Sequence, residues 1–327
     1  MSWKNLNQQS LANGWLVEHE ALQELDELNR LIDWDSVQSS LSGIHNKERG
    51  GKAWPPLLMF KILLLQVWYN LSDPRMEKQL VRDLLFRRFV GLDVALSVPD
   101  HSSIWRFRQI LQEHELLDEL LDKINEKLSN CGLCIREGTV SIVDASVIEA
   151  HNCRSKQGKE GHNTQDPEAG CSVKVAADGK KKSIYGFKAH ISADEDGFIK
   201  ATEMTAGNVH DSQVFERLLD GDESAVYADS AYASCAHDKW LTERGIENRI
   251  IHRAYRNKPL TKEQKVANRL NSATRSTVER VFGILKLHYG MGKARYRGLM
   301  RNHVRFVIMC IGYNLKRALS IQRESCA

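Results

Sequence analysis

Three acidic side chains stand where they could do chemistry. Asp144 ends a β-branched run at 139–143, and Asp229 ends a second apolar run at 225–228. Acidic residues are poor strand formers and are rarely buried, so two predicted strands that each end in Asp require an explanation. Each Asp on its own is more simply explained as the cap of the next turn. A third acid, Glu279, adds weight because it lies on a predicted helix from which a carboxylate could reach the strand ends.

Glu279 lies at the border of the packing face of that helix. At about 100° per residue, with Arg275 at zero, Glu279 falls near 40° and Lys286 near 20°. The packing side falls at about 240–340° and comprises Val278, Val281, Phe282 and Leu285. An exposed i, i+4 ion pair between Arg275 and Glu279 is the alternative interpretation. The convergence of three acids in chain order favours a catalytic role.

Three carboxylates that converge in this way indicate metal-dependent chemistry on phosphodiesters. Carboxylate oxygens are hard ligands that suit Mg²⁺, with Mn²⁺ as a substitute. Two such ions about 3.5–4 Å apart activate the attacking oxygen and stabilise the leaving one. Water as the nucleophile gives strand cleavage, and a DNA 3′-hydroxyl gives strand transfer. We therefore expect Asp144, Asp229 and Glu279 to be catalytic and to bind two Mg²⁺ ions.

The elements that would position these acids are predicted in the second half of the chain. The strand that ends at Asp144 is followed by a long polar loop at 151–182 and a hairpin at 185–205. Helices and strands then alternate, and a long helix begins at Thr261 and runs through Lys286. The order β-β-β-α-β-α-β-α predicts a mixed α/β (α+β) domain of RNase H-like type, with a five-stranded mixed sheet.

A separate all-helical domain is predicted at 1–136, before a catalytic domain at 137–327 that has a basic, helical C-terminal tail. A turn at 99–103 precedes a short helix in which Arg106 and Arg108 should project away from the packing residues. Such a helix could enter a DNA groove, although an ordinary amphipathic helix is the simpler interpretation. We expect the helical domain to bind DNA ends, to mediate oligomerisation, or both.

Positive charge is concentrated in the last quarter of the chain. From residue 249 to the end there are 18 Lys and Arg against three acidic residues, a net charge of +15, whereas the whole chain carries +4. Residues 1–248 therefore carry −11. A polyanionic partner is the expected reason, and a solvated basic surface is the alternative. The candidate phosphate contacts are Arg106, Arg108, Lys188, Arg275, Lys286, Arg295 and Arg297.

The seven cysteines have irregular spacing and do not suggest a set of disulfides. Cys131 and Cys134 have the spacing of half a zinc site, but a second such pair is missing from the sequence, so idle or buried thiols are preferred. The longest apolar run is too short for a membrane span, and the N-terminus lacks the apolar core of a secretory signal. These features predict a cytoplasmic protein with no membrane partner.

Short motifs are spread over nearly the whole chain. They include VDAS at 143–146, YGFKAH at 185–190, GNVHDS at 207–212 and YADSAY at 227–232. Further blocks lie at 64–74, 87–92, 99–108, 166–169, 275–286, 295–299 and 314–315. No single block is decisive. Together and in order, they resemble the transposases of the insertion-sequence-five family, bacterial members of the DDE superfamily.

The resemblance implies that Asp144, Asp229 and Glu279 are the metal-binding triad. It also implies double-stranded DNA partners (terminal inverted repeats and target DNA), a homo-oligomer of two or more subunits, and a place at the bacterial nucleoid. One position departs from the wider group's pattern: Ser272 stands where a Tyr precedes Arg275 by three residues. The spacing from Arg to Glu is intact, so the triad is unaffected. A DNA-binding regulator without catalysis and a plain RNase H-like nuclease are the alternatives.

Overall fold

The structure, a computed structural model, describes residues 3–4, 6, 10–16, 18–44, 52–133, 140–151, 165–175, 181–254 and 259–326. The chain divides into two compact units, here called the helical unit (Met1–Leu133 with Val307–Ala327) and the sheet unit (Cys134–Phe306). The expected domain boundary at 136 lies close to this division. The expected second domain, however, ran to residue 327, whereas the last residues group with the helical unit.

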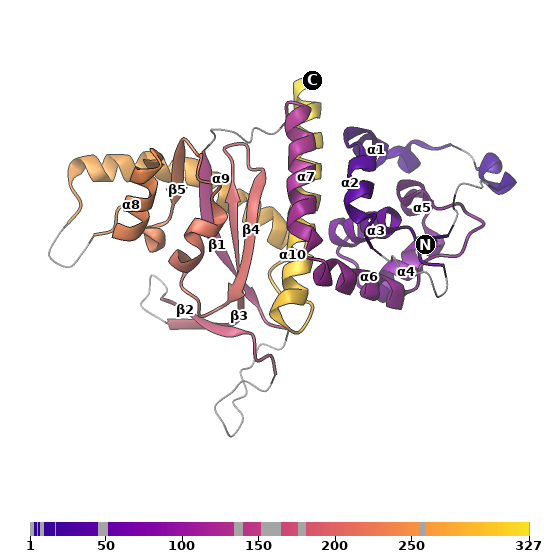
Figure 1. Ribbon diagram of the computed structural model, residues 1–327, viewed down its shortest axis with the longest axis horizontal. Helices are drawn as coiled ribbons and strands as arrows, with labels where there is room; N and C mark the ends of the chain where they lie inside the picture. Colours follow the sequence, from indigo (N-terminus) through magenta and orange to yellow (C-terminus); the bar gives the residue numbers. More distant parts are fainter. Residues whose placement is uncertain are drawn as a thin grey trace. The chain divides into compact units, whose positions relative to one another are not determined.

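The helical unit consists mainly of helices (Figure 1). Its elements are η1 (Leu11–Trp15), η2 (Glu20–Gln23), α1 (Asp26–Leu31), α2 (Trp34–Leu41), α3 (Pro56–Trp68), α4 (Asp73–Arg82), α5 (Leu84–Val90), α6 (His101–Glu113), α7 (Leu116–Asn130) and most of α10 (Leu299–Cys326). Helix α3 begins at a proline, whose fixed φ suits the first helical turn. Ten of its 13 residues are buried, so α3 forms the centre of this unit's core.

Arg108 lies inside the helical unit. Its side chain is 3% exposed, and its guanidinium donates to Asp73 at 2.5 and 3.2 Å and to Gln66 at 2.9 Å. The expectation that Arg108 projects away from the packing residues is therefore wrong. A buried arginine is tolerated here because a carboxylate and an amide satisfy it. Arg106, two residues earlier on α6, is exposed as expected.

The sheet unit holds a mixed sheet with strand order β2-β3-β1-β5-β6, in which β4 also pairs with β3. The strands are β1 (Ser141–Glu149), β2 (Gly170–Val175), β3 (Lys181–Ala193), β4 (Ile199–Ala206), β5 (Ala225–Ala228) and β6 (Glu247–Asn248). The expected mixed α+β fold is confirmed. The described residues contain six strands and not five, because β2 forms within the segment expected to be a loop at 151–182.

Strand β3 changes partner at Gly186. The residues before Gly186 pair with β2, and those after it pair with β4. Gly207, directly after β4, donates to the carbonyl of Gly186 at 3.0 Å, and a Cβ on Gly186 would lie 2.0 Å from the carbonyl oxygen of Ile148. Only a residue without a side chain fits such a close approach of two backbones. This accounts for one glycine in each of the motifs at 185–190 and 207–212.

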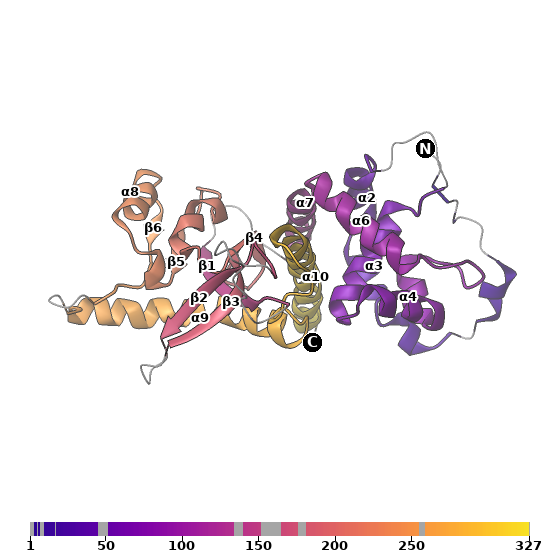
Figure 2. The ribbon, with the colours of Figure 1, turned by 90° about the horizontal axis from the view of Figure 1, so that it is seen from below.

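Helices cover both faces of the sheet (Figure 2). On one face, Val143 of β1 shares a core with Phe215 of η3 (Asp211–Leu218) and Leu241 of α8 (Cys235–Glu243). Helix α9 (Lys262–Leu287) lies against β1 and β5 on the other face. The predicted packing side of α9 is confirmed, since its buried residues include Val278, Val281, Phe282 and Leu285.

The two longest of the described helices, α9 and α10, contain 26 and 28 residues. Within the described ranges, neither these nor the shorter helices combine the length and the apolar character that crossing a membrane requires.

Candidate active site

Asp144 and Asp229 occupy equivalent positions on neighbouring parallel strands. The last registered pair of β1 and β5 is Val143 with Ala228, and the next residue on each strand is the Asp. Parallel strands run side by side with their carboxyl ends together, so the two acids are neighbours. The expected strand end is correct for Asp229, which directly follows β5. It is wrong for Asp144, because pairing with β3 continues β1 to Glu149.

Both Asp side chains point toward the face of the sheet that α9 covers. The residue before each Asp belongs to the core on the opposite face, and successive residues of a strand point to opposite sides. Accordingly, the Nη2 atom of Arg275 on α9 lies 3.4 Å from Oδ2 of Asp144. Glu279 is exposed and lies one helical turn beyond Arg275, and its charge acts on Asp144, as does that of Asp229. The three acids therefore share one electrostatic environment.

Burial dominates the protonation of Asp144. The side chain is 19% exposed, and burial raises its pKa to about 6. The positive charge of Arg275 and a hydrogen bond from the Ala145 amide, at 2.9 Å, both oppose this rise in pKa. The negative charges of Asp229 and Glu279 add to the rise. Asp144 thus lacks part of the positive charge that would stabilise its ionised form.

The donor set fits a divalent cation. The 3.4 Å contact from Arg275 to Asp144 is longer than an ordinary N–H···O hydrogen bond of about 2.7–3.2 Å. The Nε of Arg275 is buried and finds no hydrogen-bond partner among the described residues. Carboxylate oxygens are the ligands that hard divalent ions prefer. An ion held by Asp144, Asp229 and Glu279 would supply the charge that Arg275 supplies only in part.

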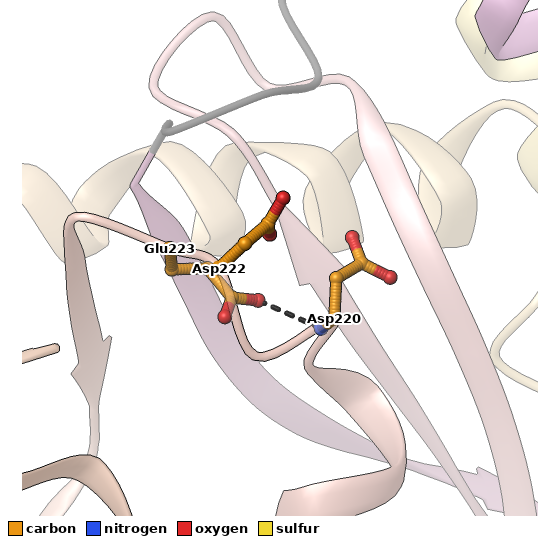
Figure 3. A group of neighbouring side chains, drawn as sticks. All are labelled: Asp220, Asp222 and Glu223. Atoms are coloured by element: carbon orange, nitrogen blue, oxygen red, sulfur yellow. Dashed lines mark hydrogen bonds between the residues drawn. The ribbon is translucent and has the colours of Figure 1, made fainter. Parts of the chain in front are cut away.

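A second acidic cluster, Asp220, Asp222 and Glu223, lies in the turn before β5 (Figure 3). Within the described ranges, these three carboxylates, and not the triad, come within 4.8 Å of one another. Two of these carboxylates already have partners within the turn or beside it. Glu223 accepts from two backbone amides of the turn, both at 2.9 Å, and Lys200 lies 3.7 Å from Asp220. The cluster also stands at the opposite end of β5 from Asp229, so it stabilises a turn and is not the active site.

Lys188 on β3 is engaged within the sheet unit. Its ammonium donates to Asp211 at 2.8 Å and to the carbonyl of Val209 at 2.7 Å, and its side chain is 14% exposed. A phosphate would have to displace Asp211 to reach it. A DNA contact by Lys188 stays a prediction, and its surroundings do not favour it.

The other cations expected to contact DNA lie in different places. Arg275 is 12% exposed and is a partner of the triad. Lys286 is exposed near the end of α9, and Arg297 is exposed in the segment between α9 and α10, where Arg295 is half-buried. Arg106 is exposed in the helical unit. Their contacts with DNA stay predictions.

Tyr232 was not among the site residues expected from the sequence. This residue ends η4 (Ser230–Tyr232), directly beyond Asp229, and is 1% exposed. Its buried hydroxyl has no hydrogen-bond partner in the described part of the chain. Burial raises the pKa of Tyr232 well above its usual value, and the charges of Asp211, Asp144 and Asp229 act in the same direction. Its place in the motif at 227–232 is the signal that includes it, because a tyrosine after a turn otherwise has the pattern of a packing residue.

The cysteine pair considered for zinc is described only in part. Cys131 is exposed and is not in a disulfide. Cys134 lies outside the described residues, so the zinc interpretation stays a prediction.

A mixed sheet with acids on two adjacent parallel strands and a third on the covering helix is an arrangement suited to metal-dependent chemistry on phosphodiesters. Comparison with known families agrees. Residues 135–315 match the family described as "Transposase DDE domain", and residues 17–110 match the "Transposase domain (DUF772)". The first match covers more than half of the chain, so the chain belongs to the DDE transposase family, whose members use divalent metal ions.

Solved structures of the Mos1 transposase are also similar to this chain. The Mos1 strand transfer complex aligns at 10% identity over 88% of this chain and 84% of that chain, with a TM-score of 0.20. The Mos1 paired-end complex with the left transposon end aligns at 11% identity over 86% and 93%, with a TM-score of 0.19.

Proposed function

We propose that this chain binds the terminal inverted repeats of a bacterial insertion element of the insertion-sequence-five family, and that it cleaves and joins DNA at those ends. The observation that supports this is the shared environment of Asp144, Asp229 and Glu279, which come from two strands and one helix. Structural carboxylates are paired with donors, as in the turn before β5. The triad instead leaves Asp144 short of positive charge.

Asp144, Asp229 and Glu279 would hold two Mg²⁺ ions, for which Mn²⁺ could substitute. Bound there, the ions would supply the positive charge that activates an attacking oxygen and stabilises a leaving oxygen of the DNA backbone. Arg275 neutralises part of the carboxylate charge and holds the Asp144 side chain in place. A guanidinium so close to the acids is also placed to contact a phosphate of the bound strand.

The DNA partner would be double-stranded, and it would comprise both the element's ends and the target. The net charge of +15 after residue 248 provides the long-range attraction to a polyanion. We propose phosphate contacts by Lys286, Arg295, Arg297 and Arg106. An element has two ends, so a homo-oligomer of two or more subunits would hold them together. A substrate of this kind places the protein at the bacterial nucleoid.

Cleavage of end-labelled duplex DNA tests the proposal. The substrate is the inverted repeat that flanks the gene, incubated with the purified protein and Mg²⁺, with shuffled duplex of equal length as the control. We expect a cut at the element's end that requires a divalent ion, followed by joining to a target plasmid. A protein that binds the ends but never cuts them is a DNA-binding regulator. One that cuts both duplexes equally is a plain nuclease.

A further inference from the structure

Residues 292–298, the last part of the connection between α9 and α10, are attached to the end of β1. The amide of Glu149 donates to the carbonyl of Gly292 at 3.1 Å, and its carbonyl accepts from the Ala294 amide at 2.7 Å. These two bonds form an isolated parallel bridge. The segment carries three cations and is called the basic segment below: Lys293, Arg295 and Arg297.

Two carboxylates hold the other end of the basic segment. Asp166 Oδ2 accepts from the Gly298 amide at 3.0 Å, and Glu168 Oε2 accepts from the Leu299 amide at 2.5 Å. Leu299 is the first residue of α10, and the first amides of a helix have no partner within it, so the acids complete this helix end. Gly298 has a φ of +96°, which other residues rarely adopt, so the turn has one specific shape.

The attachment point is itself well fixed. Asp166 is 5% exposed, and its backbone carbonyl accepts from the hydroxyl of Tyr185. From within α10, Asn302 accepts from the Tyr296 amide at 3.2 Å and donates to the carbonyls of Tyr296 and Gly298 at 2.8 and 2.7 Å. The basic segment is therefore held at both ends and in between.

We propose that Asp166 and Glu168 are positioning residues that hold the basic segment in the shape that binds DNA phosphates. This inference rests on the proposed function, because it requires Arg295 and Arg297 to contact DNA. Cations on a fixed backbone lose less conformational freedom when a phosphate binds, and the complex is correspondingly tighter.

Charge alone predicts the opposite effect of removing these acids. Asp166 and Glu168 are negative groups beside cations that attract a polyanion. If they had no other role, loss of either charge would strengthen DNA binding. If they position the segment, loss of their hydrogen bonds weakens binding although a negative charge is removed. The sign of the change separates the two roles.

Three substitutions of Glu168 separate the effect of its negative charge from the effect of its hydrogen bond with the Leu299 amide. Glu168→Ala removes both the charge and the hydrogen bond. Glu168→Asp keeps the charge, but its side chain is one methylene too short to reach the Leu299 amide. Glu168→Gln removes the charge but keeps an oxygen that can accept from the Leu299 amide. Glu195→Gln, in the exposed turn between β3 and β4, is the control for loss of one charge. If thermal melting shows that the Ala variant is unfolded, the comparison of the Asp variant with the Gln variant is sufficient for the test.

Binding of a fluorescent duplex of arbitrary sequence is measured by anisotropy over a series of salt concentrations. The Ala and Asp variants should bind DNA about tenfold more weakly than the wild type. The slope of log affinity against log salt concentration should fall by about one, which corresponds to the loss of one phosphate contact. The Gln variant and the control should bind as tightly as the wild type, or slightly more tightly. Ala or Asp variants that match the wild type would overturn the positioning role.

A double variant, Arg295→Ala with Arg297→Ala, is measured in parallel. It should weaken binding and reduce the salt dependence, because both arginines are expected to contact phosphates. If the double variant binds DNA more weakly while the Glu168 variants bind as tightly as the wild type, only the positioning role of the acids is wrong. If the double variant keeps the wild-type salt dependence, the DNA contact by the basic segment is wrong and the positioning role falls with it. The cleavage assay then decides the catalytic proposal independently.

Discussion

Asp73 in the helical unit and Asp144 in the sheet unit are both largely buried carboxylates with an arginine partner, but their surroundings differ. Asp73 accepts from Arg108 at 2.5 and 3.2 Å and from Gln66 at 2.5 Å. Asp144 has Arg275 at 3.4 Å and two acidic neighbours, and its pKa is raised to about 6.

This difference distinguishes a structural ion pair from a site suited to a cation. A carboxylate with several close donors needs no further ligand, and removal of its partner leaves a buried charge without compensation. A carboxylate crowded by other carboxylates is poorly stabilised when ionised, and such perturbed groups are concentrated at functional sites. Four predictions test the difference, from the largest expected effect to the smallest.

Asp144→Asn should reduce DNA cleavage by about a thousandfold or more, because it removes a carboxylate ligand from a metal-dependent step. DNA binding should persist, since the substitution removes no phosphate contact. End cleavage in Mg²⁺ and anisotropy, measured on the same preparation, report the two properties. A variant that still cleaves would contradict the assignment of the site.

Arg108→Ala should lower the free energy of unfolding by about 3–5 kcal/mol, because it leaves Asp73 without its counter-charge. Arg106→Ala is the matched control on the same helix. Arg106 is exposed, so its removal should change stability by no more than about 0.5 kcal/mol. Urea unfolding followed by circular dichroism measures both. Equal stability of the two variants would show that the buried pair is not structural.

Asp144→Asn should also stabilise the metal-free protein near neutral pH, by about 1–3 kcal/mol. The pKa of Asp144 rises from an ordinary 3.8 to about 6 on folding, so the folded state holds this proton more tightly. The stability it contributes is complete below pH 3.8 and is lost as the pH rises through 6. Asparagine cannot ionise and avoids this loss. Thermal melting in EDTA across this range measures it, and an advantage that is independent of pH would contradict the raised pKa.

Asp222→Asn should have the smallest effect. Asp222 belongs to the acidic turn before β5, in which Lys200 lies 3.7 Å from Asp220 and two backbone amides donate to Glu223. Neither the cleavage rate nor its dependence on Mg²⁺ concentration should change. A loss of cleavage comparable to that of Asp144→Asn would place the metal site in that turn.

The mixed α+β class of the fold and the neighbourhood of its acids are predictable because they depend on local patterns. An apolar run that leads to Asp occurs twice, and parallel pairing of those runs places Asp144 beside Asp229. The helical period places Glu279 at the edge of the packing side of α9, and the residues expected on that side are buried.

Features that depend on pairing between segments distant in the sequence cannot be predicted from such local patterns. Asp144 lies inside β1 and not at its end, because β3 pairs with the residues beyond it. Arg108 is buried because Asp73, 35 residues away in the sequence, meets it in the core. The acids that hold the basic segment lie more than 130 residues in sequence from the amides that donate hydrogen bonds to them. Hydrophobic periodicity carries no information about any of these contacts.

The continuation of β1 beyond Asp144 has a mechanical consequence. The strand runs on to Glu149, where the basic segment is attached, a length of about 17 Å at about 3.3 Å per residue. Each residue of this stretch is paired with β3, and this pairing stabilises its extended conformation. The stretch sets the distance between the carboxylates and the basic segment. This distance is about half of one turn of duplex DNA, which is about 34 Å. Deletion of two residues from the stretch would keep every side chain on its face of the sheet but would shorten this distance by about 7 Å.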